Sequence, residues 1–419
     1  MSVPASEDDS MRSALLFIVS LCLASVGRAA DWEQWRGPNS NAVAPPGESV
    51  PVKWTESSNV RWKTKVPGRG HSSPVVVGDL VVLTSADERN RAQAVIAFDR
   101  ASGKQRWLTG VSRDGFPKIH AKNTHASPTI AHSDGLFCAT FCHHRKIEAV
   151  AVDAAGEIVW RKEVGPFSPK AYEYGYAASP TIWQDMLIVT GECDTSAWMK
   201  ALDLHSGAIR WQQKRTKVLN WASPIVTKVG GREQLLISGG HMIAGYDPTS
   251  GQQRWSANCL TMATCGTCVW MDGIILASGG YPDAQTAAVS ADGSRVLWTN
   301  RVKCYEQSML CHDGYLYAFS DNGVAHCWNA KTGQEMWKKR LRGPVSASPL
   351  LVGDTIFATN EAGTTFVFKA SPAGFQSVAR NQLGEEAFAS PAVADNVLYL
   401  RVGHGRPSQR QEMLYAIAK

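Results

Sequence analysis

The stretch AFDRASGKQRW, residues 97–107, decides the fold of this chain, because nearly the same sequence returns three more times. In each copy an Asp or Asn is followed by a Gly four residues later, and a Trp follows four residues after the Gly. The Asp or Asn side chain accepts hydrogen bonds from the amides of a turn, and Gly adopts the positive φ that the turn needs. Each copy therefore predicts a hairpin whose second strand carries a Trp. The later copies are ALDLHSGAIRW at 201–211, GYDPTSGQQRW at 245–255 and CWNAKTGQEMW at 327–337.

A second repeated sequence precedes these hairpins and begins, in its clearest copies, with a small residue, Ser and Pro. SSPVVVGDLVVLTSA at 72–86 is the first of eight copies, and ASPTIWQDMLIVTGE at 178–192 is among the clearest. Pro is tolerated as the first residue of a strand, and turn residues divide each copy into two apolar runs. Together the two sequences give units of four strands in about 40 to 50 residues, which is typical of the blades of a β-propeller.

The ends of the chain predict how the ring of blades closes. The eighth copy, after Ala389, ends with MLYAIAK and has no Trp strand of its own, whereas NVRWKTKV at 59–66 is a Trp strand with no unit before it. Pairing these two segments would complete the eighth blade and remove the exposed edge of a linear array. We therefore predict an all-β, eight-bladed propeller of four-stranded antiparallel blades, closed by the N-terminal strand over residues 59–419.

The repeated Trp residues are predicted to be structural. A large flat indole on an outer strand can wedge against the neighbouring blade and bury about 150–250 Å². We assign this docking role to Trp62, Trp107, Trp160, Trp211, Trp255, Trp298 and Trp337.

The N-terminus predicts export. MRSALLFIVSLCLASVGRAA, after residue 10, has a positive residue, an apolar run and small residues near its end, as a secretory signal peptide does. We therefore divide the chain into a signal peptide within residues 1–30, with the start at Met11, an N-terminal extension over 31–58, and the propeller. This predicts a periplasmic or secreted protein with no membrane span after cleavage. The net charge is +6 without a block of Lys and Arg, so nucleic-acid binding is not expected.

The cysteines and histidines do not form a recognisable metal motif. Nine cysteines follow the signal peptide, so at least one stays unpaired, and their pairing is left open. Cys138 and Cys142 would lie roughly 13 Å apart along one strand, too far to hold one ion. His71, His125 and Glu306 could together bind a transition metal, but they lack the spacing of a known site. We assign no metal ligand.

The Gly-x-x-x-Trp sequences and the small-Ser-Pro steps resemble the tryptophan-docking repeats of the pyrroloquinoline-quinone (PQQ)-type β-propeller family. WEQWRGPNSN at 32–41 resembles the leader of such propellers in a group of exported bacterial proteins. The resemblance implies two functional classes: quinone-dependent alcohol and glucose dehydrogenases, and a non-catalytic propeller lipoprotein that helps to assemble outer-membrane β-barrels. In the dehydrogenases, adjacent cysteines pack against PQQ, and acidic and amide side chains on long insertions hold calcium. This sequence has no adjacent cysteines; the nearest pair is Cys265 and Cys268. We predict no catalytic residue and no cofactor, with PQQ and calcium as the alternative.

In a propeller, the loops that enter the innermost strands and the loops between the second and third strands share one face. Here they gather His, Glu, Arg and aromatic residues, which favours a polar binding mouth. The candidate residues are His71, His125, Tyr176, Trp221, Tyr305, Glu306, Phe388, Arg89, His241, Glu361 and Arg406.

Three functions fit this pattern. The first is an exported, monomeric, non-catalytic scaffold that binds a protein or another macromolecule of the cell envelope. The second is a PQQ- or metal-dependent oxidoreductase that acts on alcohols or sugars. The third is carbohydrate binding without chemistry, with Trp221, Tyr281 and Phe388 as platforms.

Overall fold

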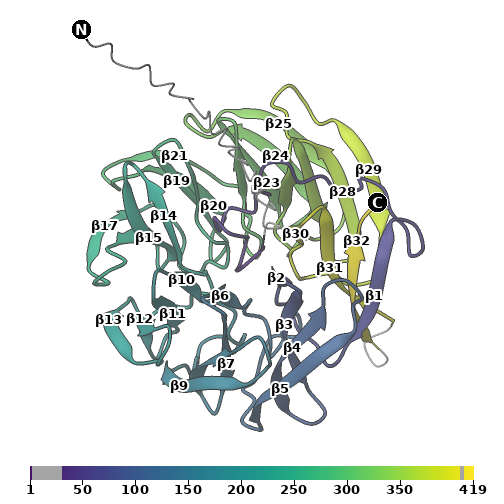
Figure 1. Cartoon of the computed structure of the whole chain (residues 1–419). Coiled ribbons are helices and arrows are strands. Elements are labelled where there is room, and N and C mark those ends of the chain that lie inside the picture. The colour runs from purple at the N-terminus through teal and green to yellow at the C-terminus, as the bar shows by residue number, and fades with distance from the viewer. Residues whose placement is uncertain (2–30, 406–409) are drawn as a thin grey trace.

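Eight four-stranded antiparallel sheets make up the part of the chain that the structure, a computed structural model, describes: residue 1, residues 31–405 and residues 410–419. Figure 1 shows the sheets as blades around a central axis, with β2, β6, β10 and β30 near the axis and β1, β5, β9 and β29 at the outside. No helix occurs within these residues. The predicted all-β, eight-bladed propeller is confirmed.

The blades follow one another in chain order, and in every blade except the fourth an inner strand of three residues is followed by longer strands. The first four blades contain β2 (Val75–Val77), β3 (Leu80–Asp87), β4 (Ala92–Asp99) and β5 (Gln105–Arg113); β6 (Ala131–Ser133), β7 (Leu136–His143), β8 (Lys146–Val152) and β9 (Ile158–Pro166); β10 (Thr181–Trp183), β11 (Met186–Glu192), β12 (Ala197–Asp203) and β13 (Ile209–Lys214); β14 (Ile225–Val229), β15 (Arg232–Gly239), β16 (Met242–Tyr246) and β17 (Gln253–Asn258). The other four contain β18 (Val269–Met271), β19 (Ile274–Gly279), β20 (Gln285–Ser290) and β21 (Val296–Asn300); β22 (Leu310–His312), β23 (Tyr315–Ser320), β24 (Val324–Asn329) and β25 (Glu335–Arg340); β26 (Leu350–Val352), β27 (Thr355–Thr359), β28 (Thr364–Lys369) and β29 (Ser377–Gln382); β30 (Ala392–Ala394), β31 (Val397–His404), β32 (Gln411–Ile417) and β1 (Val60–Val66).

The eighth blade joins the two ends of the chain. Strand β1 pairs antiparallel with β32, so that Trp62 lies opposite Ala416 and Val66 lies opposite Glu412. The N-terminal strand therefore closes the ring, as the missing Trp strand of the last repeat predicted.

The burial of the strands follows their position in the blade. Every residue of β11 is buried, because a middle strand packs against neighbouring blades on both faces. Strand β13, at the outside of the same blade, is exposed or half-buried along its whole length. The position of a strand in its blade thus explains why the middle strands are continuously apolar and the outer strands are polar.

The repeated indoles lie at the joints between blades. Trp160 of blade 2 packs on Gly207 of blade 3 and donates its N–H to the carbonyl of Leu204 at 2.8 Å. Gly207 has a φ of +68°, and a methyl group there would come within 2.7 Å of the indole ring. Equivalent bonds run from Trp62 to Arg100, Trp107 to Ala154, Trp211 to Pro248, Trp298 to Ala330 and Trp337 to Ser371, while Trp255 bonds the side chain of Gln234.

The joint between blades 7 and 8 is built differently. The outer strand of blade 7 has Val378 in place of Trp, and Trp54 of the N-terminal extension lies nearby, 4% exposed. Its backbone N–H donates to Asn381 Oδ1 of β29 at 3.1 Å, and its ring stacks on Phe357 at 6.2 Å. Trp54 belongs to the same hydrophobic cluster as Leu398 of blade 8. The extension therefore supplies the indole that the repeat lacks here.

The residues before the inner strands form a partial ring of hydroxyl groups around the channel. The N–H of Ser179 donates to Ser223 Oγ of the next blade at 2.9 Å, and the N–H of Ser348 donates to Ser390 Oγ at 2.8 Å. Similar bonds run from Ser73 to Thr129, Thr129 to Ser179, Thr267 to Ser308 and Ser308 to Ser348. A Ser or Thr hydroxyl at this position thus links one blade to the next, and in four of these six bonds the acceptor is the Ser of a Ser-Pro step.

The beginning of the extension crosses the channel (Figure 1). Trp32 forms a β-bridge with Val76 of β2 in blade 1, and Val43 forms one with Leu351 of β26 in blade 7. Between them, the Trp35 N–H donates to Thr267 Oγ1 at 2.8 Å. The segment from Trp32 to Val43 therefore occupies the channel between the inner strands.

Candidate functional site

Two sets of loops meet on one face of the propeller, which we call the mouth. They are the loops that enter the inner strands and the loops between the second and third strands. Backbone bonds join the two sets: the N–H of Asp114 donates to Arg91 at 2.8 Å, and the N–H of Gly240 donates to Met262 at 3.1 Å. The turns between first and second strands and between third and fourth strands consequently lie at the opposite face, since strands alternate in direction.

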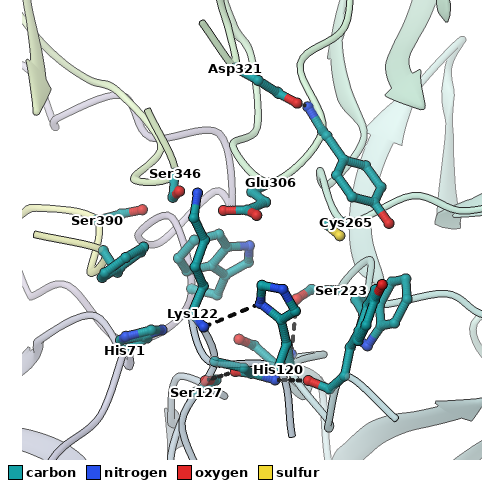
Figure 2. Close-up of a pocket in the computed structure, with 18 of the residues that line it drawn as sticks. His71, His120, Lys122, Ser127, Ser223, Cys265, Glu306, Asp321, Ser346 and Ser390 are labelled. Carbon is teal, nitrogen blue, oxygen red and sulfur yellow. Dashed lines mark hydrogen bonds between the residues drawn. The ribbon is translucent and has the colours of Figure 1, made fainter. Parts of the chain in front are cut away.

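A cavity of about 470 Å³ opens at the mouth, and the loops that enter the inner strands of all eight blades contribute to its lining. Figure 2 shows His71, His120, Lys122, Glu306 and Asp321 around this space. Its lining comprises Trp35, His71, His120, Lys122, Asn123, Ser127, Tyr174, Ala177, Ser179, Trp221, Ser223, Cys265, Lys303, Tyr305, Glu306, Asp321, Ser346, Phe388 and Ser390. The volume lies in the range of small-molecule pockets.

The charged groups of one wall compensate each other. Lys122 Nζ donates to Glu361 Oε1 at 2.8 Å, and Ser346 Oγ donates to the same oxygen at 2.7 Å. Lys303 Nζ lies 3.3 Å from Asp321 Oδ2. Burial acts to lower the pKa of Lys122, but the bond to Glu361 and nearby carboxylates outweigh it and raise that pKa above its usual value. Lys122 therefore stays charged, and Figure 2 shows its side chain rising between Ser346 and Glu306.

Aromatic side chains form the opposite part of the mouth. Tyr174 stacks on Trp221 with ring centroids 6.0 Å apart, and the Trp221 N–H is held by the carbonyl of Gly175 at 2.8 Å. The hydroxyl groups of Tyr172 and Tyr281 lie 2.7 Å apart. Tyr174 and Tyr281 are 39% and 41% exposed, so this cluster faces solvent.

His71 and Cys265, two further titratable groups of the cavity, are held neutral. Burial, with the charges of Arg69, Arg410 and Arg401, lowers the pKa of His71 well below its usual value. Burial and the charge of Glu306 raise the pKa of the Cys265 thiol well above the usual value. The imidazole of His71 also stacks on Phe388 with centroids 4.5 Å apart. These groups offer hydrogen bonds without charge.

A second cavity of about 450 Å³ adjoins the first, with His120 and Asn123 in both linings. His125 lines it and packs on Phe116 at 4.1 Å. Burial and the charge of Arg91 lower the pKa of His125 to about 4. His71 and His125 thus line different cavities.

The structure brings together about half of the predicted mouth residues. His71, Trp221, Tyr305, Glu306 and Phe388 line the main cavity. Glu361 lies beside it through Lys122, and His125 lines the second cavity.

Three predicted residues lie outside both cavities, and a fourth is not described. Tyr176 is buried, and its hydroxyl donates to the carbonyl of Thr190 at 2.9 Å. Arg89 and His241 are exposed in the loops 88–91 and 240–241. Arg406 lies outside the described residues, as does the predicted signal peptide within residues 2–30.

Sequence reasoning missed three important groups of the cavity. His120 and Lys122 come from the loop between β5 and β6, which is much longer than the loop before β2. Trp35 comes from the extension and reaches the cavity from within the channel. The unusual length of the β5–β6 loop could have indicated that its residues reach the cavity. The repeated sequences carry no information on the path of the N-terminal extension.

The residues present do not reproduce the donor set that a calcium-bound quinone would need. Among the described residues, no cluster of three or more His, Cys, Asp or Glu side chains could hold a metal ion. The carboxylates of Asp321 and Glu361 are instead paired with lysines. The nine described cysteines are unpaired, and Cys265 and Cys268 are not adjacent.

The described residues include no helix that is both long enough and apolar enough to span a bilayer.

Known proteins resemble this chain over most of its length. The sequence profile of the family described as outer membrane protein assembly factor BamB matches residues 43–131, 91–301 and 282–371. A protein of that description from Legionella pneumophila (strain Paris) is 25% identical over 123 residues, which is 29% of this chain and 31% of that relative.

Solved structures with the same fold fall into both functional classes. BamB from Moraxella catarrhalis has a TM-score of 0.62 at 18% identity, covering 85% of this chain and 96% of that one. Quinohemoprotein alcohol dehydrogenase from Comamonas testosteroni has a TM-score of 0.65 at 12% identity, covering 93% of this chain and 81% of that one. At these identities the likeness shows the fold alone.

Proposed function

Because this chain belongs to the propeller family described as outer membrane protein assembly factor BamB, we propose that it is an exported, non-catalytic scaffold whose mouth binds another macromolecule of the cell envelope. The family description places related proteins in outer-membrane assembly, and the N-terminal sequence is typical of a signal peptide. Both support a periplasmic location. We propose that the macromolecule bound at the mouth is a protein.

The observation that carries the proposal is the exposed aromatic cluster of the mouth. Tyr172, Tyr174 and Tyr281 come from two different loops, and two of the three rings are more than a third exposed. Aromatic residues that face solvent together are enriched in interaction surfaces, because they bury a large area at a small cost in side-chain entropy. The compensated wall of Lys122 and Glu361 gives this surface a polar rim.

A crosslinking experiment tests the proposal. A photo-crosslinking amino acid replaces Tyr281 in the full chain, expressed in its native host, and a matched variant carries it at Lys104. Lys104 is exposed in the turn between the third and fourth strands of blade 1, at the opposite face. We expect one predominant protein adduct from Tyr281 and none from Lys104. No adduct at the mouth, or the same adducts from both positions, would contradict the proposal.

The second candidate is a quinone-dependent oxidoreductase. It is favoured by the fold shared with quinohemoprotein alcohol dehydrogenase and by the size of the cavity. Purified protein incubated with PQQ and calcium decides between the two through the absorbance of bound quinone and dye-linked oxidation of alcohols. Under our proposal neither signal appears, whereas turnover that requires added quinone would establish the enzyme.

A further inference from the structure

The floor of the main cavity carries three buried hydroxyl groups with unused protons. Ser179, Ser223 and Ser390 line the cavity and are 4%, 5% and 7% exposed. Each oxygen accepts a backbone N–H from the preceding blade, at 2.9, 2.9 and 2.8 Å respectively. Within the described residues, none of these hydroxyls donates a hydrogen bond in return. A buried donor without a partner is costly, so the floor favours a ligand or water with acceptor oxygens.

The sides of the cavity offer flat apolar surfaces next to uncharged polar groups. Phe388 and Trp35 line it, and both are half-buried. His71 stacks on Phe388, and its Nε2 is buried without a hydrogen-bond partner in the described residues. A planar aromatic ring beside a neutral imidazole suits a ligand that has one apolar face and polar groups at its edge.

The charged residues of the wall determine which net charge of a ligand the cavity favours. Lys122 is paired with Glu361 at 2.8 Å, and Lys303 lies 3.3 Å from Asp321. These pairs compensate each other, and Glu306 adds an exposed carboxylate to the lining without an ion pair in the described residues, so an anionic ligand finds no uncompensated positive charge there. The carboxylates still have lone pairs that accept hydrogen bonds from hydroxyl groups.

We propose that the cavity binds a neutral sugar residue of a cell-envelope glycan. A pyranose ring has an apolar face for Phe388 or Trp35, oxygens that accept from the floor hydroxyls, and hydroxyls that donate to the wall carboxylates. The cavity of about 470 Å³ is of the size that small-molecule ligands occupy. This inference rests on the proposed scaffold function and adds a glycan contact to the protein contact at the rim.

The test uses the purified full chain and four defined probes: chitobiose, cellobiose, maltose and, as an anionic competitor, citrate. Binding is followed by isothermal titration and by the fluorescence of the cavity indoles Trp35 and Trp221. The variants are Phe388→Ala and Glu306→Gln; Glu306 is exposed, so its substitution leaves the fold intact. Lys104→Ala at the opposite face is the matched control, and thermal unfolding checks that each variant is folded.

We expect at least one of the three disaccharides to bind saturably with a Kd of about 1 mM, the weak end of specific recognition. Phe388→Ala and Glu306→Gln should each weaken that binding by about tenfold, or about 1.4 kcal/mol, and Lys104→Ala should leave it unchanged. The inference is overturned if no disaccharide binds, if citrate binds more tightly than all three, or if both mouth variants bind like the unaltered protein.

Failure of this inference is distinguishable from failure of the scaffold proposal. A protein adduct from Tyr281 without disaccharide binding removes the glycan contact and keeps the scaffold. Loss of both the adduct and disaccharide binding refutes both.

Discussion

The joints between blades use the same residues around the ring, whereas the mouth of the channel uses different residues in each blade. At the joints one pair of residues, a Trp and the Gly of the next blade, recurs around the ring. At the mouth each blade contributes different side chains, and the loop between β5 and β6 is far longer than that before β2. A feature that every blade needs is repeated because it holds blades together, whereas a feature that differs from blade to blade serves recognition. Disturbing joints should therefore change stability, and disturbing the mouth should change binding.

The largest effect is expected where the ring closes. Trp62→Ala removes a buried indole that packs on Gly103 and donates to Arg100, and it does so in the strand that joins the two chain ends. We expect a loss of about 3–5 kcal/mol in the free energy of unfolding. Denaturant unfolding measures it. A loss below about 1 kcal/mol would mean that the closing joint does not limit stability.

A pair of glycine variants isolates the contact between glycine and indole. Gly207→Ala places a methyl group in a positive-φ turn against Trp160, while Gly135→Ala has a similar φ with nothing within 4 Å. The backbone cost, about 1–2 kcal/mol, is shared, and overpacking adds at least about 1 kcal/mol at Gly207. Thermal unfolding of the two variants gives the difference. Equal losses would show that the indoles do not fix the turns.

The joint between blades 7 and 8 allows a smaller comparison. Trp160→Phe removes a bonded indole N–H, whereas the N–H of Trp54 is buried with no partner in the described residues. Both changes lose similar packing, so Trp160→Phe should cost about 1 kcal/mol more than Trp54→Phe. Equilibrium unfolding in urea measures both. The reverse order would contradict the assignment of Trp54 as a wedge without a hydrogen bond.

The smallest effect on stability is expected at the mouth. Lys122→Ala removes the exposed partner of the half-buried Glu361, which keeps the hydrogen bond from Ser346 Oγ. Since an ion pair with one solvent-exposed member is worth about 0–1 kcal/mol, the unfolding free energy should change by less than about 1 kcal/mol. Crosslinking from Tyr281 should nevertheless fall, which separates the mouth from the joints. A large loss of stability with undiminished crosslinking would reverse the comparison.

The eight-bladed propeller could be predicted because the residues that specify each blade are close in sequence and recur along the chain. The Asp, Gly and Trp of residues 97–107 specify a turn and an anchor, and the offset of Trp62 from the last repeat specifies closure. The joint between blades 7 and 8 could not be predicted from the sequence, because Val378 and Trp54 are far apart in the chain and meet only in the folded protein.

The mouth was only partly predictable. Counting loops from the repeats placed His71, Trp221, Tyr305, Glu306 and Phe388 at the cavity, but it could not tell which side chains turn inward. Tyr176 lies two residues after Tyr174, yet its side chain is buried and its hydroxyl donates to the carbonyl of Thr190, whereas Tyr174 faces solvent. Trp35 depends on the route of the extension through the channel, which no periodic pattern encodes.

The most direct test of the account is a crosslinking scan of both faces in the native host. One exposed position in each mouth loop and one in each third-to-fourth-strand turn receive the photo-reactive residue in turn. We predict that adducts with a common partner cluster at positions around Tyr172, Tyr174 and Tyr281. Adducts that arise mainly from the turns of the opposite face would show that recognition takes place away from the mouth.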